Sequence, residues 1–258
     1  MMYPMMQKRI YLPVLLFASA LLCAQQPQTT LPEAPAPNSG MPPTETVSPE
    51  DLDISAARVL ENYLAAIGGK DKLAAVKSIA MLATANVQGS VLELWLKKTA
   101  QDQFMQDITM MGNVMSRQVL NGNEGYVLVQ GQERQLGPEE IARIKEEAVP
   151  FPEMYYLKKE GITLLGVESF GEKKAYALKI TENKTNYYDV ETGLKLREVN
   201  KAEIQGQQMT QVLAYYNYDE VAGIYFPMLF VQSTAGQNVE FNVGEILVNE
   251  GVTDADFE

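Results

Sequence analysis

The sequence predicts a mainly β protein, built as a strongly curved antiparallel sheet with a few helices on its concave face. From Ser78 onward, apolar and polar residues alternate with a period of two over roughly twelve short segments. Turn-forming residues separate these segments, as at Gly89-Ser90, Gly112-Asn113 and Glu191-Thr192-Gly193. Helical patterns precede the alternation and interrupt it once. Short strands at such regular spacing are typical of a sandwich or barrel.

Residues 1–24 have the pattern of an export signal. Lys8 and Arg9 form a basic start, and the uncharged apolar segment 10–23 follows. That segment is shorter than the roughly 20 apolar residues that span a bilayer. Ala18-Ser19-Ala20 fits a cleavage site, and a cut after Ala24 is the alternative. No later stretch is long and apolar enough to span a bilayer. We therefore expect an exported chain with no transmembrane segment after cleavage.

Cys23 is the only cysteine of the 258 residues. It is a candidate for lipidation, although Leu22 stands where lipoprotein signals carry a small residue. A single cysteine cannot form an intramolecular disulfide. The remaining chain of roughly 200 residues is long enough to bury a core without one.

Residues 25–50 are expected to be a disordered linker. They contain 7 of the 13 prolines and almost no large apolar side chains, so they cannot bury enough surface to fold. We therefore divide the chain into a signal over 1–24, a linker over 25–50 and one folded domain over 51–258.

The domain is expected to open with a helix. Ser48 is the expected N-cap, Pro49 suits the first turn, and Gly68-Gly69 ends the helix. A short second helix is expected over 70–76. Two further helices are expected in the middle of the chain. One starts at Pro138, and a short one covers 152–159. The expected strands are 78–88, 91–99, 102–110, 113–120, 125–130, 162–169, 174–181, 184–190, 194–204, 208–219, 226–234 and 238–248.

Composition argues against most catalytic and nucleic-acid-binding functions. The chain has no histidine, which excludes a Ser/His/Asp triad and a His-ligated zinc site. Without Lys8 and Arg9 the net charge is 19 − 33 = −14, which disfavours nucleic acid. The acidic pairs Glu139-Glu140 and Glu146-Glu147 are interpreted as a solvated helix face. We therefore expect no enzyme, no metal and no cofactor.

The second half carries a more specific pattern. A strand, a turn and a strand run from Tyr187 to Glu198, and the chain then contains Tyr215, Tyr218, Gly223-Ile224, Phe226-Pro227, Val248-Asn249 and Phe257. Together with Ile67-Gly68-Gly69 and Val76-Lys77-Ser78-Ile79, this resembles the outer-membrane lipoprotein-sorting protein group of exported bacterial proteins, with a LolA/LolB-like fold. The resemblance implies an open half-barrel with a helical lid over an apolar cavity that holds acyl chains. No residue here matches the arginine that such carriers use in their cavity.

Two functions are favoured at this point over a third, a carboxylate-only hydrolase. The first is a periplasmic or outer-membrane-associated carrier of lipid or lipoprotein acyl chains, with helix 52–67 and the helices between 137 and 160 as lids. The second is an interaction module of an envelope complex, with an interior filled by side chains. For the carrier, the expected cavity residues are bulky apolar residues on strands: Trp95, Phe104, Met105, Met110, Met115, Tyr126, Tyr188, Leu213, Tyr215 and Phe230.

Overall fold

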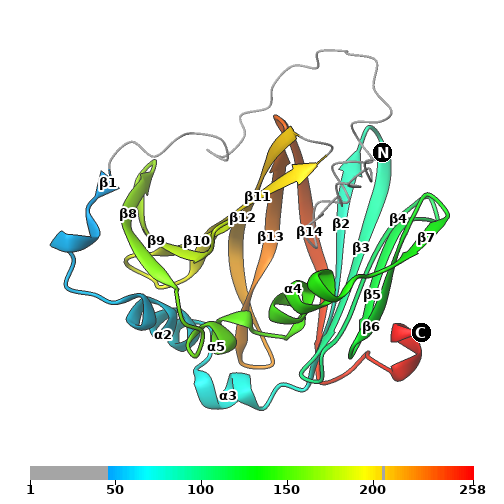
Figure 1. Ribbon diagram of the computed structural model, residues 1–258, viewed down its shortest axis with the longest axis horizontal. Coiled ribbons are helices and arrows are strands. Elements are labelled where there is room, and N and C mark those ends of the chain that lie inside the picture. The colour runs from blue at the N-terminus through cyan, green and yellow to red at the C-terminus, as the bar shows by residue number, and fades with distance from the viewer. Residues whose placement is uncertain (1–45, 205–206) are drawn as a thin grey trace, which may run out of the picture.

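The protein is a single curved antiparallel sheet with helices inside its curve (Figure 1). The computed structural model describes residues 46–204 and 207–258, and within them 14 strands pair in the order β1-β8-β9-β10-β11-β12-β13-β14-β2-β3-β4-β5-β6-β7. The edge strands β1 and β7 stand at the two ends of this order, so the sheet is an open half-barrel. The prediction of a mainly β, curved antiparallel fold is confirmed. The expected signal, Cys23 and residues 25–45 of the expected linker lie outside the described residues.

The first elements differ from the expected opening helix. Strand β1 (Thr46–Val47) lies within the range expected to be linker, yet it pairs with β8. A short 3₁₀ helix η1 (Pro49–Asp51) follows, and helix α2 (Ala56–Ala66) begins only after Ser55. Ser55 caps α2, because its hydroxyl oxygen accepts a hydrogen bond from the backbone N–H of Arg58 at 3.2 Å. The expected cap at Ser48 is therefore wrong.

The first half of the sheet is a continuous meander. Helix α3 (Lys70–Ala74) leads into it after Gly69, whose φ of 87° is readily adopted only by glycine. The strands are β2 (Ser78–Val87), β3 (Ser90–Thr99), β4 (Gln103–Met110), β5 (Asn113–Asn121), β6 (Glu124–Val129) and β7 (Gln132–Gln135). All but β7 match expected strands to within a residue or two.

The second half is another meander that closes onto the first. Its strands are β8 (Thr163–Phe170), β9 (Lys173–Thr181), β10 (Lys184–Asp189), β11 (Lys195–Ile204), β12 (Gln207–Val221), β13 (Ile224–Thr234) and β14 (Gln237–Val248). Strand β14 pairs with β2, so the last strand joins the first half in the middle of the sheet. The strands β7 and β8, which are consecutive along the chain, therefore lie near opposite edges.

This topology places two helices inside the curve. The chain from β7 to β8 must cross the whole width of the sheet, and it does so as α4 (Pro138–Ala148) and α5 (Pro152–Tyr156). Figure 1 shows α4 in the hollow of the sheet, and α2, α3 and α5 gathered at its lower end. The helices between 137 and 160 thus occupy the place expected of a lid.

The two faces of the sheet have different cores. The large core lies on the concave side and includes Leu94, Phe104 and Ile144 of α4. A small cluster lies on the convex side, where Met105 and Val119 pack against Phe257 of the C-terminal 3₁₀ helix η2 (Asp254–Phe257). Among the described residues, no helix is both long and apolar enough to cross a bilayer.

The close approach of β6 to β5 predicts a strong effect of one glycine. A Cβ added at Gly125 would lie 2.5 Å from the backbone oxygen of Val119 and 2.9 Å from Leu136 Cδ1. We expect Gly125→Ala to lower the free energy of unfolding by about 1–3 kcal/mol, measured by urea denaturation. Gly244→Ala is the matched control, because its Cβ would meet nothing closer than Leu82 O at 4.0 Å. Equal stability of the two variants would contradict the prediction.

Candidate functional site

The half-barrel encloses a cavity of about 500 Å³. It lies between the concave face of the sheet and the segment that contains α4 and α5. Its volume falls within the range of roughly 300–1,000 Å³ that is usual for small-molecule sites. Side chains therefore leave part of the interior unfilled. The interaction-module alternative would require a filled interior.

Apolar side chains form much of the cavity wall. Strands β3 and β4 contribute one side, and β12 and β13 contribute the other. The lid adds the ring of Phe151, which lies 6.2 Å from the ring of Phe226. The apolar residues lining the cavity are Tyr63, Ile67, Met81, Leu94, Leu96, Phe104, Pro150, Phe151, Pro152, Ala202, Leu213, Tyr215, Tyr218, Tyr225, Phe226, Pro227, Phe230 and Ile246.

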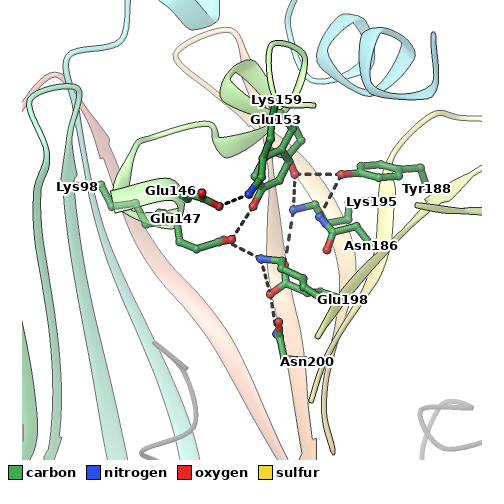
Figure 2. Close-up of polar contacts among 12 residues, drawn as sticks. Lys98, Glu146, Glu147, Glu153, Lys159, Asn186, Tyr188, Lys195, Glu198 and Asn200 are labelled. Atoms are coloured by element: carbon green, nitrogen blue, oxygen red, sulfur yellow. Dashed lines mark hydrogen bonds and ion pairs between the residues drawn. The ribbon is translucent and has the colours of Figure 1, made fainter. Parts of the chain in front are cut away.

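A chain of ion pairs joins the lid to the floor of the cavity (Figure 2). Glu147 at the end of α4 contacts Lys184 Nζ at 2.6 Å, and Lys184 contacts Glu198 at 3.1 Å. Tyr156 of α5 donates its hydroxyl hydrogen to the same Glu147 carboxylate, at 2.6 Å. Asn200 donates to Glu198 at 2.9 Å. These contacts connect α4 directly to β10, and they tie α5 to the same network through Glu147.

A second ion pair anchors α5. Glu153 is almost fully buried, with 1% of its surface exposed, and its carboxylate lies 2.5 Å from Lys195 Nζ. Tyr188 donates its hydroxyl hydrogen to the same carboxylate at 3.3 Å. The Lys195 ammonium also lies over the rings of Tyr63 and Tyr215, at 5.7 and 5.6 Å from their centroids. Pairing of this kind offsets the cost of burying each charge.

The pKa values reflect this pairing. Burial would raise the pKa of Glu198, but the ammonium groups of Lys184 and Lys195 outweigh burial and lower it to about 2. Burial would lower the pKa of Lys184, but Glu147 and Glu198 raise it above its ordinary value. Glu153 and Glu198 do the same for Lys195. Lys184, Lys195 and Glu198 are therefore charged at neutral pH.

Lys98 behaves differently from these two lysines. Its side chain also lines the cavity, and its ammonium donates a hydrogen bond to the backbone oxygen of Glu147 at 2.7 Å. Burial lowers the pKa of Lys98 to about 8, and Glu147 offsets this only in part. Lys98 thus carries a partly desolvated charge on the cavity wall.

Three of the four acidic residues of α4 are partly buried and paired, and this corrects the sequence interpretation for them, whereas Glu139 is exposed as expected. Glu147 joins the network just described, and Glu146 pairs with Lys159. Glu140 forms a two-pronged contact with Arg134 at 2.8 and 3.0 Å. Within the described residues, no group of three or more His, Cys, Asp or Glu side chains could hold a metal ion. Carboxylates here act as structural partners of lysine and arginine.

The ten sequence-predicted residues fall into three places. Phe104, Leu213, Tyr215 and Phe230 line the cavity. Tyr188, Met110 and Met115 belong to the concave core, where Tyr188 reaches the site through Glu153. Trp95, Met105 and Tyr126 pack around the convex cluster instead. Successive side chains of a strand point to opposite faces, so Trp95 lies opposite Leu94 and Leu96. The expectation that Trp95 lines the cavity is therefore wrong.

Sequence reasoning missed the charged residues of the site. These five residues, Lys98, Glu153, Lys184, Lys195 and Glu198, come from four different elements, and their pairing depends on the fold. The one local signal was Lys195 with Glu198, opposite charges in the segment that carried the family resemblance.

Comparisons with solved structures identify the fold. A LolA superfamily protein from Nitrosomonas europaea matches with a TM-score of 0.51 and 13% identity, over 80% of this chain and 98% of its own. The fold is LolA-like. A DUF1329 family protein from Desulfovibrio piger matches with a TM-score of 0.49 and 13% identity, over 78% of this chain and 95% of its own. The Mycobacterium tuberculosis lipoprotein LppX matches with a TM-score of 0.32 and 10% identity, over 77% of this chain and 99% of its own.

Sequence comparisons add no family to this result, since no family model and no curated protein matches the chain. At 13% identity the structural likeness concerns the LolA-like fold alone. The function must therefore be argued from the cavity and its walls.

Proposed function

We propose that the protein is a non-enzymatic carrier of an apolar ligand, such as the acyl chains of a lipid or lipoprotein. The observation that carries this proposal is the cavity of about 500 Å³ beneath α4 and α5. A protein interior is normally packed to the density of an organic crystal, so an unfilled space of this size calls for an occupant. Apolar walls suit acyl chains, because each buried methylene contributes about 0.8 kcal/mol.

The lid supports the same proposal. Helices α4 and α5 rest on the sheet through ion pairs and through Phe151, and loops flank both helices. A ligand enters when this segment moves away from β10 and β11. Such lids close a site and shield it from water.

Export completes the proposal. Residues 1–24 have the pattern of an export signal, and a LolA-like carrier would act in the periplasm or at the outer membrane. Its partners would be a lipid or an acylated protein, and an envelope protein that delivers or accepts the ligand. Lipidation at Cys23 would tether the carrier to a membrane.

Native mass spectrometry tests the carrier directly. The full chain is expressed in a bacterium with its N-terminal segment, purified from the periplasmic and membrane fractions, and analysed before and after lipid extraction. We expect an additional mass in the lipid range that disappears on extraction and returns when lipid is added. A protein that never carries such a mass, and takes up no added acyl ligand, would rule out the proposal.

A cavity-filling variant locates the ligand. Leu96 lines the cavity and is only partly buried, so Leu96→Trp should occupy free space and reduce the bound lipid about tenfold or more. Val91→Trp is the matched control on the same strand, because Val91 is 53% exposed on the convex face. Bound lipid is quantified after extraction from equal amounts of each protein. Similar lipid content in both variants would place the ligand outside this cavity.

A further inference from the structure

Lys98, whose side chain is partly buried, lacks the ionic partner that Lys184 and Lys195 have in the same cavity. Lys184 contacts Glu147 and Glu198, and Lys195 contacts Glu153. Among the side chains that the structure describes, which do not include those of Asp51 and Glu203, no carboxylate lies within ion-pair distance of Lys98, and its hydrogen bond is to the Glu147 backbone oxygen. An ammonium has three N–H donors, so two remain for another acceptor.

Gln106 is the second unsatisfied group on the same wall. Its side chain is 2% exposed, lines the cavity, and has an amide oxygen without a hydrogen-bond partner in the described structure. Buried polar side chains are nearly always hydrogen-bonded, and exceptions point to an absent ligand or water. The unpaired atom is an acceptor, so an anionic ligand requires the amide to turn over and present its NH₂ group, the donor, to the cavity.

The strand register brings the two groups together. Lys98 pairs with Phe104 across β3 and β4, and Leu96 pairs with Gln106. Lys98 and Gln106 are therefore diagonal neighbours on one face of the sheet, a spacing that long side chains bridge. Around them the wall is apolar, with Leu94, Leu96 and Phe104.

We propose that the cavity binds a single-chain amphiphile whose anionic oxygen headgroup is held by Lys98 and Gln106. The ammonium supplies charge and two donors, and the amide supplies a third donor through its NH₂ group. The apolar wall takes the chain. A volume of about 500 Å³ is that of a single small-molecule site. This inference rests on the proposed carrier function and specifies the class of its ligand.

The neighbouring charges favour an anion at this point. The charged groups with the largest effect on the pKa of Lys98 are Glu147 of α4, Lys184 of β10, and Lys195 and Glu198 of β11. The cavity wall also carries Arg143, Glu146, Glu153 and Lys201. Glu147 and Glu198 are already engaged by Lys184, and Glu198 contacts Lys195 at 3.9 Å. An incoming anion would therefore neutralise Lys98 without breaking an existing ion pair. An uncharged headgroup would leave the buried ammonium uncompensated.

Matched ligands test the headgroup. Delipidated full-length protein is loaded with the uncharged fluorescent probe N-phenylnaphthylamine, which is displaced at pH 7 by dodecanoate, dodecyl phosphate or dodecanol. We expect both anions to displace the probe at concentrations about tenfold or more below that of dodecanol. Preference for one anion over the other would distinguish a carboxylate from a phosphate headgroup. Equal displacement by all three would refute the headgroup site and leave the carrier proposal standing.

Substitutions of Lys98 and Gln106 test whether these residues cause the preference for anionic ligands over dodecanol. Lys98→Met and Gln106→Leu should each remove most of the preference for anions while dodecanol still binds, and Lys98→Arg should retain it. Lys201→Met is the control, because Lys201 also lines the cavity but is exposed. A loss of preference in Lys201→Met equal to that in Lys98→Met would overturn the assignment. If neither the probe nor any ligand binds to the wild-type protein, the carrier proposal itself fails.

Discussion

Replacing Glu153 by leucine is expected to lower the free energy of unfolding by about 3–5 kcal/mol. The carboxylate is almost fully buried and lies 2.5 Å from Lys195 Nζ. Without it, Lys195 keeps only the longer contact to Glu198, at 3.9 Å, and Tyr188 loses a hydrogen-bond acceptor. A buried charge without its partner is far more costly than the absence of both. Urea denaturation at pH 7 measures the change.

The double variant Glu153→Leu/Lys195→Met tests this reason. It removes both charges, so we expect it to recover most of the stability that Glu153→Leu loses. Glu61→Leu is the surface control, because Glu61 pairs with Lys70 at 2.9 Å in an exposed position, where the pair is screened by water. A Glu153→Leu variant as stable as Glu61→Leu would show that the buried pair contributes nothing to the fold.

Most of the sheet could be predicted from the sequence, because alternation of apolar residues and turn-forming residues are local signals. The segment 91–99 became β3 (Ser90–Thr99), and Leu92 and Leu94 do lie on the buried face. Strand β7 could not be predicted. Its residues, Gln132 to Gln135, are all polar and exposed, so no alternation marks it. Pairing with β6 alone makes it a strand.

The cavity was less predictable than the sheet. A bulky apolar residue on a strand can pack on either face of the sheet. Phe104 and Trp95 therefore look alike in the sequence, although they lie on opposite faces of the sheet. An apolar residue that lines a cavity also resembles one that fills a core. Buried lysines and glutamates, by contrast, look like surface residues in a sequence. Only long-range pairing, as between Glu147 and Lys184, shows that they are interior.

Removing the Lys98 charge should stabilise the ligand-free protein, in contrast to the loss expected at Glu153. The pKa of Lys98 is about 8 in the fold and 10.5 ordinarily, a difference that corresponds to roughly 3 kcal/mol. Lys98→Met also leaves the Glu147 backbone oxygen without its donor, at a cost of about 1 kcal/mol. We therefore expect delipidated Lys98→Met to be more stable than wild type by about 2 kcal/mol at pH 7, by urea denaturation.

The pH dependence separates this effect from ordinary repacking. Below pH 8 Lys98 is charged in both states, and the whole cost of burying its charge is present. Between pH 8 and 10.5 the folded protein releases this proton while the unfolded chain keeps it, so wild-type stability rises relative to Lys98→Met. Lys184 and Lys195, whose pKa values are raised, titrate above this window and are present in both proteins. The advantage of the variant should therefore shrink steadily from pH 8 to 10.5. A constant advantage across that range would mean that the methionine packs better and that the charge is not the cause. The expected result would instead show that the fold tolerates a costly charge at a wall position where an anionic ligand would neutralise it.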